Sequence, residues 1–213
     1  MFVKLIFLLI FLFISSFAIE AQKTVDSVKV GIVNGKATYL PKPDYPQEAK
    51  DFCAGGKVEI EVLIGENGNV IKAKAISGDK LLRDVSVEAV KKAKFSTTSE
   101  FPVKTEGIIV YNFPSEKKCI DAGIVNKKAI FIPKPEFPKS CRCAGNVVVQ
   151  IIYDQNGKVT KARAVSGNPR LRISAVKSAQ KAWFSPPLVE TDYQFYVKGL
   201  LVYNFSSDGK ISF

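Results

Sequence analysis

The sequence predicts an α+β protein with two tandem small domains, each a three- or four-stranded antiparallel sheet with helices packed on one face. Three observations predict this class: a repeat over most of the chain, strand-like alternation ended by Asn-Gly turns, and one helical stretch in each repeat. The length of 213 residues allows one large domain or two small ones, so the repeat decides the number of domains.

The repeat is clearest near the two ends of each copy. Residues 31–46 match residues 123–138 with ten identities in sixteen positions, at an offset of 92. The offset is 92 again where residues 107–113 match residues 199–205, and it is 89 in between. Two copies of about 90 residues are each long enough for a core of their own, unlike the much shorter repeats of solenoids.

Residues 1–21 are expected to be a secretory signal peptide, because Lys4 precedes an apolar run that ends in small residues. An uncleaved membrane anchor is the alternative. As a helix the apolar run would span only about 21 Å, short of the roughly 30 Å hydrocarbon core, so cleavage is favoured. The mature chain is then exported to the periplasm, with a first domain at residues 22–115 and a second at residues 116–213.

The beginning of each domain predicts a hairpin and an extended segment. In the first domain, residues 30–40 alternate around an Asn-Gly pair, which is typical of a two-residue β-hairpin turn. Two prolines then favour extended backbone, because proline lacks an N–H donor and disfavours helix in the residue before it. A short helix is expected over residues 47–52.

The rest of each domain predicts a small sheet covered by a helix. Residues 57–64 alternate as a half-buried strand, and a second Asn-Gly pair leads into a strand over residues 69–76. Apolar residues then recur at helical spacing over residues 82–93, with Asp79 as the candidate N-cap. Residues 107–113 are expected to be the last strand.

Short motifs occur in the same order in both copies. In the first copy they are Tyr45-Pro46, Gly56-Lys57-Val58, Asn67-Gly68-Asn69-Val70, Ser77-Gly78, Lys94-Phe95-Ser96 and Val110-Tyr111-Asn112-Phe113. In the second copy they are Phe137-Pro138, Gly145-Asn146-Val147, Asn156-Gly157-Lys158-Val159, Ser166-Gly167, Trp183-Phe184-Ser185-Pro186 and Val202-Tyr203-Asn204-Phe205. In this order and spacing, nearly all of the mature chain resembles the C-terminal domain of TonB, the bacterial energy transducer, present in two tandem copies.

The resemblance implies a periplasmic module that is not an enzyme. Such a module binds an extended segment of outer-membrane transporters, or another envelope protein, by adding it to a sheet edge, and it supports TonB-dependent transmembrane transport. It can also contact peptidoglycan. The expected partner-strand edge is the last strand of each copy, with residues Ile108, Val110, Tyr111, Asn112, Phe113, Leu200, Val202, Tyr203, Asn204 and Phe205.

The alternative is a structural envelope protein that binds peptidoglycan or another anionic polymer. In that case the sheet edges pair with one another, or the hairpin of residues 30–40 covers them. A homodimer through the sheet edges is a further option.

The chain differs from an energy transducer in ways that bear on function. A transducer has an uncleaved membrane helix with a His that couples it to a motor, whereas this sequence contains no His. A transducer also has a long Pro-rich spacer, whereas residues 22–29 contain no Pro and reach at most about 28 Å when extended. We therefore expect the receptor-facing half without the motor-facing half, so the chain alone would not transmit force.

The four cysteines fit an oxidising compartment and allow three pairings. A bond between Cys141 and Cys143 is disfavoured, because a two-residue separation usually strains disulfide geometry. We expect Cys119 to bond to Cys141 or Cys143, with Cys53 joined to the remaining cysteine. A redox or metal site at Cys141 and Cys143 is the alternative, but tetrahedral thiolate sites need four convergent ligands, so we expect no metal.

Positive charge is concentrated in the second copy. Residues 22–115 carry 14 Lys+Arg and 12 Asp+Glu, whereas residues 116–213 carry 16 and 7. A basic surface in an exported protein is expected to contact anionic envelope polymers or acidic protein segments, and not nucleic acid. A merely solvated face is the alternative. The densest cluster comprises Arg142, Lys158, Lys161, Arg163, Arg170 and Arg172.

No set of side chains predicts catalysis. Without His, the Ser-His-Asp and Cys-His nucleophile systems and the His-bearing zinc sites are excluded. Glu59 and Glu61 could form an acid-base pair, but the second copy has Val148 and Gln150 at these positions. We predict no enzyme activity and no cofactor, and we expect the recurring aromatic residues, Trp183 among them, to pack in the core or along the edges.

Overall fold

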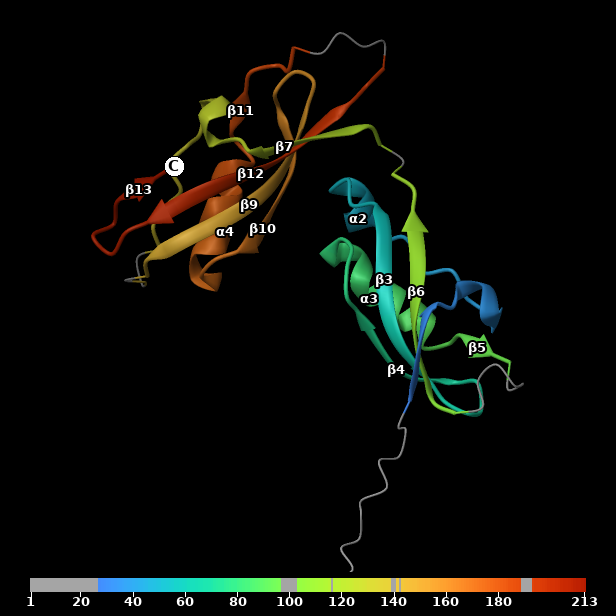
Figure 1. Cartoon of the computed structure of the whole chain (residues 1–213). Helices are drawn as coiled ribbons and strands as arrows, with labels where there is room; N and C mark the ends of the chain where they lie inside the picture. The colour runs from blue at the N-terminus through green and yellow to red at the C-terminus, as the bar shows by residue number, and fades with distance from the viewer. Residues whose placement is uncertain (1–26, 97–102, 116, 139–140, 142, 189–192) are drawn as a thin grey trace, which may run out of the picture.

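The computed structural model describes residues 27–96, 103–115, 117–138, 141, 143–188 and 193–213, which form two α+β units (Figure 1). Unit 1 ends at residue 115 and unit 2 begins at residue 117, and each unit has a hydrophobic core of its own. The predicted signal peptide and Arg142 lie outside the described residues. Among the helices in the described ranges, none combines the length and apolarity needed to cross a membrane.

Unit 1 contains a four-stranded sheet in the order β1-β6-β3-β4, with α3 on one face. The strand β3 is antiparallel to β4 and β6, as expected, whereas β1 joins β6 in parallel, so the sheet is mixed. In chain order the elements are β1 (Val28–Ile32), the 3-10 turn η1 (Asn34–Lys36), β2 (Ala37–Tyr39), α2 (Gln47–Asp51), β3 (Gly56–Ile64), β4 (Val70–Ala75), α3 (Lys80–Val90), β5 (Lys94–Phe95) and β6 (Thr105–Phe113).

Among its described residues, unit 2 repeats this order with one α-helix fewer and one strand more. Its sheet runs β10-β9-β12-β13, and β7 pairs in parallel with β12 beside β13. Its elements are β7 (Cys119–Ile124), η2 (Asn126–Lys128), β8 (Ala129–Phe131), β9 (Gly145–Asp154), β10 (Val159–Ser166), α4 (Pro169–Ala179), β11 (Trp183–Phe184), β12 (Tyr196–Phe205) and β13 (Ile211–Ser212).

The core of each unit lies between the sheet and its long helix. Every second residue of β3, from Val58 to Ile64, is at most 1% exposed, because the period of a strand places these side chains on one face. They pack with Leu82, Ala89 and Val90 of α3. The alternation in the sequence therefore predicted both the strand and the face that it buries.

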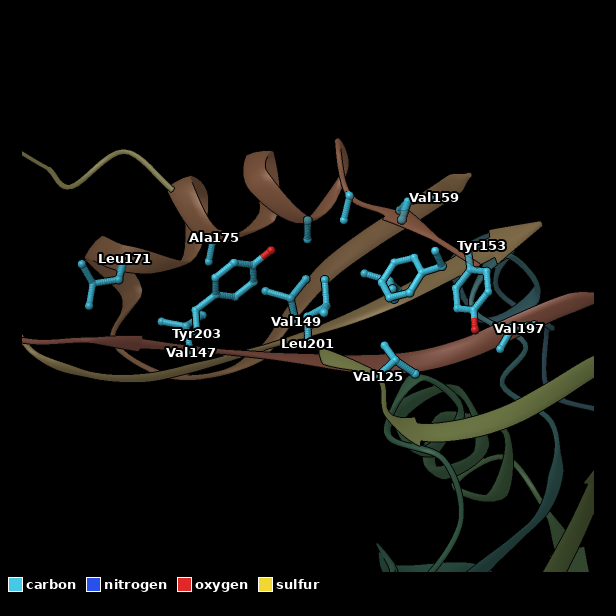
Figure 2. Packing of buried hydrophobic residues seen from close by; sticks show 14 of the residues in the cluster. Val125, Val147, Val149, Tyr153, Val159, Leu171, Ala175, Val197, Leu201 and Tyr203 are labelled. Carbon is cyan, nitrogen blue, oxygen red and sulfur yellow. The ribbon is translucent and has the colours of Figure 1, made fainter. Parts of the chain in front are cut away.

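Unit 2 has the same arrangement (Figure 2). Val147 and Val149 of β9 and Leu201 of β12 pack with Leu171 and Ala175 of α4 in one buried cluster. Both long helices begin at a polar cap, as the sequence predicted for the first: the backbone N–H of the second helical residue donates to the side chain of Asp79 in α3 and of Asn168 in α4.

The hairpin predicted over residues 30–40 is wrong. The strands β1 and β2 do not pair with each other, because β1 pairs with β6 and β2 with β5. The Asn-Gly pair lies in η1, and the side chain of Asn34 hydrogen-bonds the backbone of Val110 instead of directing a hairpin turn. A local turn signal is therefore used for a contact 76 residues away in the sequence.

The disulfides also differ from expectation. Cys53 is bonded to Cys119 and Cys141 to Cys143, so the expected bond from Cys119 to Cys141 or Cys143 is wrong. Both thiols of the alternative metal or redox site are thereby used in a disulfide.

The strand register explains this pairing. Cys119 lies at the end of the sheet where β9 finishes with Asp154, whereas Cys143 comes two residues before Gly145, where β9 begins. The ten residues of β9 separate these ends by roughly 30 Å at about 3.3 Å per residue. Cys119 is therefore too far from Cys141 and Cys143 to bond to either, and it bonds to Cys53 of unit 1, while Cys141 and Cys143 bond to each other.

Replacing Cys53 and Cys119 by Ser should destabilise the chain far more than replacing Cys141 and Cys143. The first bond closes a loop with a sequence separation of 66, worth about 4 kcal/mol on the chain-entropy model, and the second a loop of separation 2, worth about 1.6 kcal/mol. Urea unfolding of both double variants measures this difference. Equal losses of unfolding free energy would contradict it, and mass spectrometry of nonreduced digests checks the pairing directly.

A buried tyrosine links β6 to the segment before α2, and another links β12 to α4. The Tyr111 hydroxyl donates to the carbonyl of Pro41 at 2.8 Å. The Tyr203 hydroxyl accepts from Ser178 Oγ of α4 at 3.2 Å, and Figure 2 shows this hydroxyl pointing toward the helix. Burial raises the pKa of both Tyr111 and Tyr203 to about 12.

These pKa values predict a loss of stability at high pH. Because the folded-state pKa lies above the ordinary value of about 10, the contribution to stability is complete below pH 10 and is lost as the pH passes through about 12. Absorbance at 295 nm should show a late-titrating fraction of the seven tyrosines that coincides with unfolding. Tyr203→Phe should reduce that fraction, and a titration identical to the unsubstituted chain would refute the assignment.

Candidate functional site

The outer edge of β6, which the sequence marked for a partner strand, is covered by three parts of the chain. β1 pairs with β6 from Thr105 to Ile108, and the N–H of Val33 then donates to the carbonyl of Ile108 at 2.9 Å. Next, the Asn34 side chain accepts from the N–H of Val110 at 2.9 Å and donates to its carbonyl at 2.8 Å. One amide side chain thus takes the place of a paired strand residue.

A glycine makes this arrangement possible. A Cβ added to Gly107 would lie 2.7 Å from a methyl carbon of Val33, which is fully buried. Gly199 faces Val125 in the same way, at 2.8 Å. The repeated Gly-Ile-Val-Asn and Gly-x-x-Val-Tyr-Asn-Phe motifs are therefore two halves of one packing contact, which holds the asparagine against the strand.

The edge of β12 in unit 2 is covered further. Asn126 bonds both backbone groups of Val202, at 2.8 and 2.9 Å, as Asn34 does in unit 1. The strand β13 then pairs with β12 at Asn204 and Phe205. At its other end β12 pairs with β7, whose first residue, Cys119, is bonded to unit 1.

The edge of β6 in unit 1 is covered less firmly. All five residues of β1 are exposed except the half-buried Val30, with Ile32 at 67%. One exposed ion pair, Lys29 with Glu106 at 3.4 Å, joins β1 to β6. Among the described residues no strand pairs with the outer edge of β6 beyond Val110, so the edge is open at Asn112.

The predicted edge residues divide between two environments. Tyr111, Phe113, Tyr203 and Phe205 face the core and are at most 7% exposed. The others lie on the opposite face of the sheets and are half-buried or exposed: Ile108, Val110, Asn112, Leu200, Val202 and Asn204. That these strands bind a partner stays a prediction.

The opposite edges of the two sheets are formed by β4 and β10. Lys72 and Lys74 of β4 are exposed, and lysines on an edge strand discourage pairing with other chains. The sequence did not single out these two strands as edges.

The predicted basic cluster does not form one surface. Lys161 and Arg163 do project together, but toward α2 of unit 1, which Figure 1 shows at the end of unit 1 that faces unit 2. Lys161 Nζ lies 2.9 Å from an Asp51 carboxylate oxygen, and an Arg163 guanidinium nitrogen lies 3.9 Å from Glu48. Lys158, Arg170 and Arg172 lie elsewhere: beside β11, in the first turn of α4, and against the Gly167 carbonyl.

This contact between the units is apolar at its centre. Phe52, Cys53 and Ile152 are buried together, and the Arg163 guanidinium lies 4.9 Å from the centre of the Phe52 ring. The hydrogen bond from Lys161 is the largest cause that lowers the pKa of Asp51 below its usual value. The alternation of basic residues on β10 is visible in the sequence, but no pattern there indicates that α2 would meet them.

Trp183 differs from expectation as well. It is 45% exposed on β11, opposite Phe131 of β8, which is 59% exposed. The expectation of core or edge packing fails because β8 and β11 form a separate two-stranded ribbon outside the main sheet, whereas the next residue, Phe184, is fully buried and stacks on Tyr153.

The geometry defines a class of protein: tandem α+β units in which the outer edges of β6 and β12 are covered in part by other segments of the same chain. Residues 41–113 match the family of the Gram-negative bacterial TonB protein C-terminal. The matched part of the chain runs from before α2 to the end of β6, which confirms the sequence resemblance to this family for the first copy. The strand β1 lies outside the matched range.

The chain is also similar to a solved structure, the solution NMR structure of the Pseudomonas aeruginosa TonB CTD. The identity is 21%, the match covers 41% of this chain and 96% of that one, and the TM-score is 0.34. No curated protein matches the chain.

Replacing Asn34 or Asn126 by Ala should destabilise the chain by about 1–3 kcal/mol, because the strand loses two hydrogen bonds and two backbone groups lose their partners. Asn156→Ala, at an exposed turn in unit 2, is the matched control and should cost less than about 0.5 kcal/mol. Urea unfolding measures all three variants. Losses no larger than that of the control would show that the asparagines do not hold the edges.

Proposed function

We propose that this protein is a periplasmic TonB-like module that binds an extended segment of an outer-membrane transporter by strand addition at the outer edge of β6. The observation that carries the proposal is that this edge, inside the family match, is covered by β1, a strand outside the match with four of its five residues exposed. Export through a cleaved signal peptide at residues 1–21 is part of the proposal.

Strand addition requires a strand whose outward backbone groups can pair with another chain. At Asn112 the edge of β6 is already open. The strand β1 is held by its backbone pairing, by Val30 against the core, by one ion pair with Glu106, and by the buried Val33 that follows it. A partner segment that starts to pair at Asn112 can extend toward Thr105 by displacing the Asn34 side chain and then β1. The backbone hydrogen bonds that β6 loses when β1 leaves are replaced by backbone hydrogen bonds of the same kind to the partner segment.

Unit 1 is the better receptor of the two units. In unit 2 the corresponding strand β7 is fixed by the bond between Cys119 and Cys53, and β13 covers the other end of β12. A partner strand at β12 would have to displace a covalently held strand on one side and a hairpin on the other. We assign unit 2 a supporting role in strand addition, although both copies share the same motifs.

A second candidate function has its own support. The edges of β6 and β12 are paired largely within the chain, which is what a structural envelope protein with self-paired edges requires. Such a protein would bind peptidoglycan or another anionic polymer through the positive charge of unit 2. Sedimentation with purified peptidoglycan at low salt tests this alternative.

Displacing β1 by mutation should strengthen binding of the partner segment. Val30→Asp places a charge on the one half-buried residue of β1 and should raise the affinity for synthetic transporter N-terminal segments by at least about five-fold, because the edge is then free more of the time. Titration calorimetry with the full chain measures the affinity.

Ala122→Asp is the matched control, because Ala122 is the equivalent residue of β7 in the repeat. It should leave the affinity unchanged, since β7 is held by its disulfide and is not displaced. Binding that no substitution in β1 alters would place the partner at another edge, and a complete absence of binding to transporter segments would favour the second candidate.

A further inference from the structure

Unit 2 has a groove on the outer side of α4. Its volume is about 860 Å³, and it lies between the helix and the extended segment Pro133–Pro138. Ser178 of α4 hydrogen-bonds the carbonyl of Pro133, which fixes the two walls to each other at one end. The 11 residues of α4 make the groove about 16 Å long.

Basic and apolar side chains line the groove together. Lys134 on the extended segment and Arg170, Lys177 and Lys181 on the helix side bring four positive charges, against the single negative charge of Glu136. Arg170, Lys177 and Lys181 are seven and four residues apart, so they follow one another along a single face of the helical turns. In the described part of the chain, none of the four has a carboxylate within ion-pair distance.

The helix also exposes an apolar residue in the groove. Ile173 is 69% exposed and lies between Arg170 and Lys177 on the same face, and Phe137 and three prolines line the groove with it. A large aliphatic side chain in water among unpaired cations contributes nothing to the core of unit 2, which Leu171 and Ala175 supply from the opposite face of α4.

The repeat shows that the excess of positive charge is specific to unit 2. At the offset of 89 that aligns α4 with α3, Arg170, Ile173 and Lys177 correspond to Leu81, Asp84 and Glu88 of unit 1. The other two cations are matched, Lys134 by Lys42 and Lys181 by Lys92. The equivalent positions of unit 1 therefore carry two positive charges against the three negative charges of Asp44, Asp84 and Glu88. Arg170 also lies in the first turn of α4, where the helix dipole disfavours a cation by about 0.3–1 kcal/mol, so neither the fold nor the helix requires a positive charge there.

We propose that this groove is a binding site for an extended, acidic polypeptide segment in which carboxylates alternate with apolar residues. The alternation of an extended chain places carboxylates toward the cations while the apolar residues meet Ile173, Phe137 and the prolines. About five extended residues span the length of α4. The mixture of unpaired cations and exposed apolar walls favours a polypeptide over a polysaccharide, which offers charges but no apolar side chains.

Fluorescence anisotropy with the full, disulfide-bonded chain tests the proposal. The probe is a labelled peptide of about ten residues in which glutamate alternates with valine, measured at about 20 mM salt, where screening is weak. Lys177→Glu with Lys181→Glu should weaken binding by at least roughly ten-fold, equivalent to about 1.4 kcal/mol. The matched control, Lys127→Glu with Lys128→Glu, changes the net charge equally at exposed positions outside the groove and should change affinity less than about two-fold.

Two further measurements sharpen the result. Ile173→Asn should also weaken binding, which attraction by charge alone would not predict. Equal losses of peptide affinity in the two double variants, or no binding of the peptide, would overturn the proposal. Tighter binding of polygalacturonate through the same lysines would also overturn it and would reassign the groove to an acidic polysaccharide. The groove lies in unit 2, whereas the edge of β6 lies in unit 1. Val30→Asp should therefore not alter binding in the groove, and the two proposals succeed or fail separately.

Discussion

The rest of the structure depends on how each unit pairs the outer edge of its last strand. An antiparallel hairpin followed by one more strand leaves a row of backbone N–H and C=O groups on that strand, and an unpaired row invites association with other chains. The chain covers it in the same way twice, with a parallel strand, a buried valine against a glycine, and an asparagine that bonds both backbone groups of one residue. After Asn34 and Asn126 the chain continues into β2 and β8, which pair with β5 and β11. It then runs to the helix side of each sheet, where Tyr111 bonds the carbonyl of Pro41 in unit 1 and Ser178 bonds that of Pro133 in unit 2.

The two units cover this edge in the same way, but their covering strands are not held equally. Only one of these strands, β7, is bonded covalently to another part of the molecule. Cys119 begins β7 and is bonded to Cys53, next to α2, so the covering strand of unit 2 and the contact between the units are one covalent structure. Asp51 of α2, held by Lys161 and Lys117, closes this contact around Phe52 and Ile152. The strand β1 has no such attachment in the described chain. Two copies that look alike in sequence therefore differ in how their covering strands are attached: β7 is tied to unit 1 by a disulfide, and β1 is held by noncovalent contacts alone among the described residues.

What could be predicted from the sequence was governed by local periodicity. The alternation in residues 57–64 gave both a strand and its buried face, and the spacing of apolar residues after Asp79 gave a helix with its cap, because these patterns are set by neighbours in the chain. The hairpin prediction at Asn34 was wrong because Asn-Gly between alternating residues is a hairpin signal. The side chain of Asn34 instead bonds Val110, which is 76 residues away in the sequence. Lys161 and Arg163 were correctly expected to project together, but their acidic partners belong to the other unit, and nothing local to β10 indicates them. The prediction of the disulfide pairing was wrong for the same reason, because the pairing depends on which end of β9 each cysteine lies near.

The differences between the two copies carry information that their similarities do not. Positions that are equal in both units, such as Gly107 with Gly199 and Asn34 with Asn126, maintain the fold and its covered edge. Positions that differ on an exposed face cannot be required by that fold, because the other unit folds without them. The face of α4 with Arg170, Ile173 and Lys177 is such a place, since unit 1 has Leu81, Asp84 and Glu88 on the same helix geometry. Unit 2, whose edge is covered at both ends, carries a basic groove instead, and the two proposals therefore assign binding to different surfaces: a sheet edge in unit 1 and a helix groove in unit 2.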